Sequence, residues 1–303
     1  MVVKERENAS EILLTAFAAD AAGRVATSTL NTWLSGLRFW HIVNGAPWHA
    51  GPMLEQTRKG VRKLVPATSK RRKRPPVTVE HMYALRSGLD LTNSFDAAVW
   101  AIACVAFWSC CRLGELVVPS RNTFDSVKHV ARSAPLSFSS INETRFATLH
   151  IPWTKTTLVE GADISITARK DPSCPVSALE HHLRCNSSIP AHAPFFAFST
   201  AAGGWAPMTR DWFLHRCNKI WVAAGLPDMP GHGFRIGGAT HLLLSGVPPD
   251  IVATQGRWLS RAFLEYWRWI ESILPLFIST SGFSSRFDAI SKAMDHYRRK
   301  HHL

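Results

Sequence analysis

The sequence predicts a mainly α-helical protein with one small antiparallel β-sheet, arranged as two domains. Three observations lead to this prediction. Apolar residues recur at helical spacing through most of the chain. In one pair of short segments, apolar and polar residues alternate as they do in the strands of a β-hairpin. A basic run that ends in two prolines interrupts the helical pattern in the first third of the chain and suits a linker between domains.

The composition indicates a globular, basic protein with a polyanionic partner. The 303 residues include 35 Lys and Arg against 22 Asp and Glu, which gives a formal net charge of +13. Charged residues make up 19% of the chain, too few for a solvated disordered polymer, and hydrophobic residues make up 46%, enough to bury a core. The usual polyanions for such a charge are nucleic acids and anionic membranes.

A membrane ranks behind nucleic acid as the expected partner. The longest strongly apolar stretch without a charge, residues 97–111, has 15 residues, whereas a bilayer span needs roughly 18. No apolar segment follows Lys4 and Arg6, so no secretory signal is expected. The six cysteines include no Cys-x-x-Cys pair and are too sparse for a small secreted domain, which indicates a reducing compartment.

The sharpest change in composition predicts the domain boundary. Residues 1–76 contain 13 basic and 5 acidic side chains, and residues 77–303 contain 22 and 17, so the first quarter carries most of the excess charge. We therefore expect a helical domain over 1–69, a linker over 70–76 and a second domain over 77–303. The linker can be a solvated hinge, a tether that contacts phosphates or a nuclear-import signal, and these roles are compatible. Its basic residues are Lys70, Arg71, Arg72, Lys73 and Arg74.

The first domain is predicted to be a small helical bundle with one basic side. Ser28 or Thr29 can cap a helix that carries Trp33 and Trp40 among its apolar positions. A tryptophan stripe at helical spacing is more often part of a core than a platform for base stacking. A second helix is expected over 52–64. Its basic side chains are the better candidates for DNA contacts: Arg58, Lys59, Arg62 and Lys63.

The second domain is predicted to be helical around one small sheet. Thr78 begins a first helix, and a strongly apolar helix begins at Asp96. Segments 146–153 and 162–167 then form a hairpin. Further helices are expected at 176–185, 209–224 and 234–245, as a short turn from 249, and as a last pair at 261–270 and 284–299, with Gly225 and Gly246 as stop signals.

Two pairs of polar residues have the spacing of a functional site. Arg112 and Glu115 lie three residues apart, so the carboxylate can pair with the guanidinium and orient it. His232 and Arg235 have the same spacing in a glycine-rich segment that begins a helix, where anions bind readily. Either pair alone is a modest signal of function.

No metal site and no cofactor are predicted. His181, His182 and Cys185 contain a helical i, i+4 pair that could hold zinc, but so few ligands without partners elsewhere are more often coincidence. The sequence has no P-loop, no His-Glu-x-x-His motif and no acidic cluster of metal-ligand type. Cys110 and Cys111 follow an apolar helix and resemble buried small hydrophobic residues.

Taken in chain order, the polar residues resemble the active site of the tyrosine recombinase (phage-type integrase) family. The resemblance rests on three boxes: Cys111-Arg-Leu-Gly-Glu-Leu116, His232-Gly-Phe-Arg235 and Gly256-Arg-Trp-Leu-Ser-Arg-Ala-Phe-Leu-Glu-Tyr266. It covers most of residues 77–270, and the last box is close to the form of eukaryotic, retroelement and Crypton-like members. Residues 1–69 and the linker resemble, more weakly, the family's helical core-binding (SAM-like) domain. The resemblance implies that residues 77–303 form a tyrosine-recombinase catalytic domain.

The resemblance implies DNA breaking and rejoining without metal or ATP. A tyrosine hydroxyl attacks a DNA phosphodiester, which gives a 3′-phosphotyrosyl link and a free 5′-hydroxyl, and another strand's hydroxyl reverses the step. The nonbridging oxygens gain negative charge in the transition state. Arg112 and Arg235, supported by Glu115, are suited to stabilise it because guanidinium groups are permanently charged and planar.

The resemblance also assigns the remaining catalytic roles. Lys155, in the turn of the hairpin, is the general acid that protonates the leaving 5′-oxygen. His232 assists proton transfer or donates a hydrogen bond to the phosphate. Trp258 stands where many members carry a second histidine, and its indole N–H can donate a hydrogen bond but cannot shuttle a proton. Tyr266 is the nucleophile.

The resemblance leaves several alternatives open. The partner is double-stranded DNA, and a terminal helix that docks on a neighbouring protomer implies a tetramer on DNA, although docking on its own protomer is equally open. A mobile-element enzyme is expected in the nucleus if the host is eukaryotic, and otherwise inside the cell. The other hypotheses are a domesticated DNA-binding relative without catalysis and a type IB topoisomerase-like enzyme.

Overall fold

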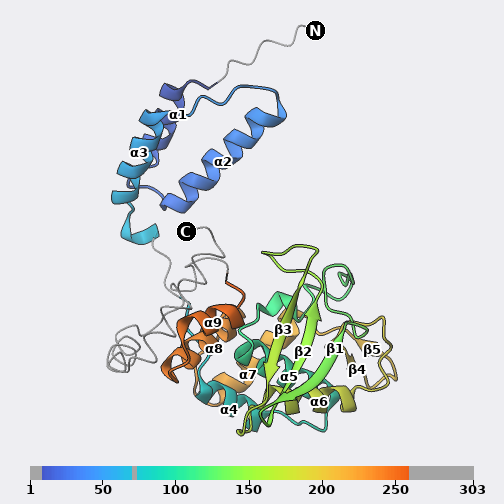
Figure 1. Ribbon diagram of the computed structural model, residues 1–303. Coiled ribbons are helices and arrows are strands. Elements are labelled where there is room, and N and C mark those ends of the chain that lie inside the picture. The colour runs from blue at the N-terminus through green and yellow to red at the C-terminus, as the bar shows by residue number, and fades with distance from the viewer. Residues whose placement is uncertain (1–8, 70–73, 259–303) are drawn as a thin grey trace. The chain divides into compact units, whose positions relative to one another are not determined.

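The computed structural model describes residues 9–69 and 74–258, and it consists of two compact units (Figure 1). The first unit spans Met1–Lys73 and the second spans Arg74–Leu303. Both are mainly helical, and small antiparallel sheets occur in the second unit. The predicted fold class is therefore confirmed.

The first unit contains three α-helices and a short 3-10 turn within its described residues. They are α1 (Glu11–Asp20), α2 (Thr27–Val43), α3 (Pro52–Lys63) and η1 (Ala67–Ser69). Their core includes Leu14, Leu30, Leu34, Leu54 and Val61. The sequence analysis did not identify α1, because only Leu14 and Ala18 of this helix are buried and its apolar pattern is therefore weak.

Two details of α2 differ from the prediction. The N-cap is Ala26, without a side-chain hydrogen bond, so neither Ser28 nor Thr29 caps the helix. Trp33 and Trp40 are 44% and 40% exposed and do not belong to the core. The buried stripe of α2 consists of Leu30, Leu34 and His41, and the tryptophans lie on its flank.

The second unit is built around one fully buried helix, α5 (Ser94–Trp108). Every residue from Asp96 to Trp108 is buried, which explains why this stretch of sequence is apolar on all sides. Asn93 caps the helix, and Asp96 in its first turn accepts a hydrogen bond from Nη2 of Arg216 at 2.6 Å. The preceding helix, α4 (Val79–Gly88), begins after the predicted cap, Thr78.

A three-stranded antiparallel sheet covers part of this core. The strands are β1 (Leu136–Ile141), β2 (Thr144–Ile151) and β3 (Ala162–Thr167), in the order β1-β2-β3. Figure 1 shows them side by side, and Leu149 in the central strand pairs with Leu136 and Ile164. The predicted hairpin is β2 and β3. The analysis missed β1, because all but its first residue are exposed and its apolar alternation, Leu136 and Phe138, stops at Ser140.

The remaining helices follow the predicted order, and two short strands between them, β4 (Phe198–Ser199) and β5 (Trp205–Ala206), were not predicted. The helices are α6 (Pro175–Cys185), α7 (Arg210–Ala223), α8 (His232–Leu244) and α9 (Pro249–Gln255). Gly225 and Gly246 follow α7 and α8 with φ of 77° and 80°, the left-handed conformation expected of helix stop signals. The helices predicted at 261–270 and 284–299 lie outside the described residues.

Two glycines bring α8 very close to the core. A Cβ at Gly238 would lie 1.8 Å from the carbonyl oxygen of Phe107 in α5, and a Cβ at Gly237 would lie 1.9 Å from that of Val77. Only glycine permits such an approach of two backbones. The contact places Arg235, on the same helix, beside the chain that leaves α5.

Candidate active site

Arg112 and Glu115 form a tight pair just after α5. Arg112 directly precedes a single 3-10 turn, η2 (Leu113–Glu115), and Glu115 is the last residue of that turn. The backbone N–H of Arg112 donates to Oε2 of Glu115 at 2.9 Å, and Nη1 of Arg112 donates to Oε1 at 2.9 Å. Glu115 is buried, whereas the side chain of Arg112 is 25% exposed. The buried carboxylate therefore orients a guanidinium group that remains partly accessible.

Arg235 lies deeper, on the first turns of α8, and is 1% exposed. Its Nη1 donates to the carbonyl oxygen of Cys110 at 2.6 Å, and its Nη2 donates to that of Gly256 at 2.6 Å. The guanidinium carbon lies 4.1 Å from the centre of the Trp258 ring, within cation–π range. Backbone carbonyls and an aromatic ring thus fix this side chain. Burial, and then the charge of Arg112, lowers the pKa of Arg235 to about 10.

A third arginine, Arg257, joins the same cluster and was missed by the sequence analysis. Its Nη2 donates to Oε2 of Glu115 at 2.6 Å, and its side chain is 14% exposed. The sequence feature that could have identified Arg257 as a site residue was its place between Gly256 and Trp258 in the third box. A sequence does not show, however, that an arginine next to a tryptophan turns back to a carboxylate more than a hundred residues earlier.

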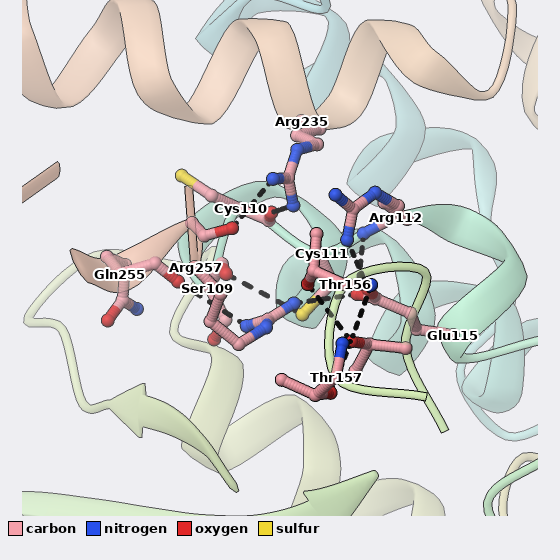
Figure 2. Close-up of polar contacts among 12 residues, drawn as sticks. Ser109, Cys110, Cys111, Arg112, Glu115, Thr156, Thr157, Arg235, Gln255 and Arg257 are labelled. Atoms are coloured by element: carbon pink, nitrogen blue, oxygen red, sulfur yellow. Dashed lines mark hydrogen bonds and ion pairs between the residues drawn. The ribbon is translucent and has the colours of Figure 1, made fainter. Parts of the chain in front are cut away.

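The cluster holds more positive than negative charge. Figure 2 shows the guanidinium groups of Arg112 and Arg235 next to each other, with Arg257 and Glu115 on either side of Cys111 in this view. Glu115 pairs with Arg112 and Arg257, whereas Arg235 donates to backbone carbonyls. With three guanidinium groups and one carboxylate, these four side chains carry an excess of two positive charges. Like charges held this close repel, and an anion placed between them recovers that free energy.

Lys155 lies in the turn between β2 and β3 and is exposed. The buried hydroxyl of Thr154 shapes this turn by accepting hydrogen bonds from the N–H groups of Thr156 at 3.3 Å and Thr157 at 3.1 Å. Figure 2 includes Thr156 and Thr157 in the same close-up as Glu115. Within the described part of the chain, the side chain of Lys155 has no hydrogen bond or ion pair.

The other predicted catalytic residues fall on two segments. His232 is the first residue of α8, one turn before Arg235, and is half-buried. Trp258 is 9% exposed and packs with Cys110 as well as with Arg235. Tyr266, the predicted nucleophile, lies outside the described residues. The structure thus brings Arg112, Glu115, Arg235 and Trp258 together, and it places His232 on the helix that carries Arg235.

The predicted DNA contacts on α3 are exposed. Arg58 donates from Nη2 to the side chain of Asn31 at 2.9 Å, and Lys59 pairs with Glu55 at 3.0 Å. Arg62, Lys63 and, in the linker, Arg74 are also exposed, and Lys70, Arg71, Arg72 and Lys73 lie outside the described residues.

The described residues contain no cluster of potential ligands that could hold a metal ion. The side chains of His181 and His182 contact the backbone carbonyls of Leu91 and Phe195 at 2.8 and 3.1 Å. Cys110 and Cys111 are fully buried, as predicted, and burial raises the pKa of both thiols, that of Cys110 to about 12. No helix in the described ranges combines the length and apolar composition of a membrane span.

Solved structures of site-specific recombinases share this fold. The chain resembles the XerH site-specific recombinase, solved bound to a palindromic difH substrate as a post-cleavage complex, with a TM-score of 0.54 and 13% identity. The match covers 89% of this chain and 72% of the XerH chain. This likeness shows that the protein has the fold of a site-specific recombinase.

Two further recombinase structures are similar at lower scores. XerA recombinase matches with a TM-score of 0.44 and 14% identity over 76% of this chain and 73% of its own. FLP recombinase, solved in a Holliday junction complex, matches with a TM-score of 0.41 and 13% identity over 61% of this chain and 44% of its own. No family model and no curated protein sequence matches this chain.

Proposed function

We propose that the protein is a DNA breaking and rejoining enzyme of the tyrosine recombinase type. One observation carries the proposal: Arg112 and Arg235 converge, together with Arg257, around a single carboxylate. The fold shared with XerH supports it, because that site-specific recombinase was solved bound to its difH substrate in a post-cleavage complex. The described site fits a single phosphate group better than any small neutral substrate.

The charges of this site are suited to a phosphorane transition state. Arg235 stays charged at neutral pH, since its pKa of about 10 lies well above 7. In this proposal, Arg112 contacts the phosphate from the exposed side of the site, and the buried Arg235 stabilises it through its positive charge. Because the nonbridging oxygens gain charge as the transition state forms, removal of one such donor costs about 3 kcal/mol, roughly a hundredfold in rate.

In the proposed reaction, the phenol oxygen of Tyr266 attacks the phosphorus and the bond from phosphorus to the 5′-oxygen breaks. The phenol proton passes to His232 or to water, and Lys155 gives a proton to the leaving 5′-oxygen. The products are a 3′-phosphotyrosyl link and a free 5′-hydroxyl, and attack by another strand's hydroxyl reverses the step. Glu115 orients Arg112, and Trp258 supports Arg235.

The biological setting is part of the proposal. The form of the third box supports a mobile-element enzyme, which acts in the nucleus if its host is eukaryotic and otherwise inside the cell. The same resemblance supports a tetramer on double-stranded DNA. The core-binding role of 1–69 and the phosphate contacts of α3 and the linker rest on the exposed basic side chains of α3 and Arg74 and on the basic sequence of the linker.

A covalent-capture experiment tests the enzymatic proposal. The substrates are random duplexes that each carry a nick. Cleavage near the nick releases a short fragment with the free 5′-hydroxyl, so the reaction cannot reverse and the covalent adduct accumulates. We expect the wild-type protein to form an adduct that survives SDS. Tyr266→Phe should abolish the adduct because phenylalanine has no nucleophilic oxygen, whereas Tyr83→Phe, on the exposed side of α4, should not.

The outcomes separate the alternatives. If the protein binds DNA but forms no adduct on any duplex, the result supports the alternative of a DNA-binding protein without catalysis. If adducts form, a second duplex with a free 5′-hydroxyl should be joined to them by a recombinase, whereas plasmid relaxation without such joining indicates a topoisomerase-like enzyme. EDTA should leave the adduct yield unchanged, since arginines supply the charge in this scheme.

A further inference from the structure

Arg257 is held in an unusual backbone conformation at the edge of the candidate site. Its φ is 56°, a left-handed value that non-glycine residues rarely adopt. The residue before it, Gly256, gives its carbonyl oxygen to Arg235, and the residue after it, Trp258, places its ring against Arg235. Such strain persists only where surrounding contacts hold it in place, and here the ion pair with Glu115 does so.

The two oxygens of Glu115 bind the guanidinium groups of two different arginines, and Oε2 also accepts from the backbone N–H of Arg112. Oε1 accepts from Nη1 of Arg112 at 2.9 Å, and Oε2 accepts from Nη2 of Arg257 at 2.6 Å. Burial lowers the pKa of Arg257, but contacts with Cys111 and Glu115 outweigh this and raise it overall, so the side chain is firmly cationic. Without Arg257, the buried carboxylate would offer both oxygens to Arg112, in the bidentate geometry that guanidinium groups prefer.

The sharing of Glu115 has a direct effect on Arg112. A bidentate pair with Glu115 would turn two N–H groups of Arg112 inward and away from an incoming anion. With Oε2 shared by the backbone N–H of Arg112 and Nη2 of Arg257, the guanidinium group of Arg112 donates to the carboxylate through Nη1 alone. A quarter of the Arg112 side chain remains exposed. Arg257 also makes the net charge of the site more positive by one.

We propose that Arg257 is a positioning residue: by occupying Oε2 of Glu115 it keeps Arg112 free to bind the scissile phosphate, and it ties the Gly256–Trp258 segment around Arg235. This inference rests on the proposed recombinase function and assigns a role to a residue outside the set that the sequence analysis identified. Arg257 acts through Arg112 and Arg235 and does not itself contact the DNA.

The test compares Arg257→Ala with a matched variant, Arg216→Ala. Arg216 also donates from Nη2 to a buried carboxylate at 2.6 Å, that of Asp96, but it lies on α7 and belongs to no proposed catalytic group. On a duplex captured by the wild-type protein, we expect Arg257→Ala to form the adduct at least about tenfold more slowly in a single turnover, with DNA affinity changed less than about threefold. Arg216→Ala should keep the wild-type rate. Arg257→Lys retains the charge and should recover part of the rate.

A neutral substrate provides a readout that a merely structural role would not affect. A methylphosphonate replaces one nonbridging oxygen of the scissile phosphate by a methyl group, so less negative charge develops for Arg112 to stabilise. The slow cleavage of Arg112→Ala and of Arg257→Ala should both be largely relieved on this substrate, to within about threefold of wild type. A loss due to misfolding would be equal on both substrates.

Three results would overturn the inference. A wild-type rate for Arg257→Ala, with Tyr266→Phe inactive, refutes the role of Arg257 and leaves the proposed function intact. An equal loss on the phosphate and the methylphosphonate shows that Arg257 is only structural, and if Arg257→Ala does not fold, Arg257→Lys supplies the same comparison. Absence of any adduct from the wild-type protein removes the inference together with the proposed function.

Discussion

Burial distinguishes the two arginines that define the site. Arg235 is held by two backbone carbonyls and a tryptophan ring, and Arg112 is held by one carboxylate. The sequence spacing was sufficient to predict the Arg112–Glu115 contact, because residues three apart in a helical turn share a face. It was not sufficient to predict Arg257, because a left-handed residue and a contact across 142 positions are set by tertiary packing.

A buried histidine gives a prediction about acid stability. His182 is fully buried in α6, and burial lowers its pKa from 6.5 to about 4, with further lowering from the charges of Arg132 and His181. Between these two values the unfolded chain binds a proton that the folded chain does not, so the free energy of unfolding falls as the pH falls.

The size of this effect can be measured. We expect His182 to cost about 3 kcal/mol of stability between pH 7 and about pH 4. Urea denaturation at both pH values should therefore show a smaller loss for His182→Gln than for the wild-type protein. Equal losses in the two proteins would show that protonation of His182 does not contribute.

At the scale of elements, the strongly patterned segments were predictable and the half-exposed ones were not. Residues 97–108 are apolar on every side because this part of α5 is surrounded, and Thr78 and Thr209 accept the backbone hydrogen bonds expected of caps. By contrast, α1 and β1 bury few residues, so their apolar positions show little period. Trp33 and Trp40 were expected in the core and are partly exposed, because the three helices of the first unit bury only one stripe of α2.

The packing of α8 on α5 gives a prediction at this scale. Gly238→Ala would place a methyl group 1.8 Å from a backbone carbonyl that cannot move aside, so the helices must separate. We expect a loss of about 3 kcal/mol or more in the free energy of unfolding. The adduct should be lost as well, because Arg235 would leave the carbonyl of Cys110.

A helical glycine in open space provides the control. A Cβ at Gly60 in α3 would meet no atom within 4 Å. Gly60→Ala should therefore raise the unfolding free energy by about 0.5–1 kcal/mol, since alanine loses less backbone entropy in a helix. Calorimetry on the two variants measures both effects, and similar melting temperatures would contradict the close-packing explanation.

For the whole molecule, the spacing of apolar residues predicted the mainly helical class and the composition predicted the basic character, whereas the arrangement of charge in space needed the structure. Part of the excess charge of +13 lies on an exposed basic helix, α3, and part lies in a partly buried cluster in the second unit. These two sites have different expected roles. Exposed cations bind phosphates along the duplex, and the buried cluster acts on one phosphate.

Salt dependence tests the first of these roles. If Arg62 and Lys63 each contact a phosphate, the double change Arg62→Gln and Lys63→Gln should reduce the slope of log affinity against log salt by about 2, because each contact contributes about 0.9. The paired change Lys128→Gln and Lys219→Gln removes the same charge from exposed positions of the second unit and should leave the slope unchanged. A flat salt response of the wild-type protein would exclude nucleic acid as the partner.

Two buried groups near the site point to a tension between stability and activity. The Nε atoms of Arg235 and Arg257 have no hydrogen-bond acceptor among the described residues. Each such donor costs about 1–3 kcal/mol, and the folded chain carries this cost before any DNA is bound. The benefit is to activity, because charged groups that are already fixed in place need little rearrangement during the reaction. Because Arg257 also binds the buried Glu115 and Arg235 also binds two backbone carbonyls, laboratory evolution for heat resistance alone would supply acceptors for these Nε atoms and keep the arginines.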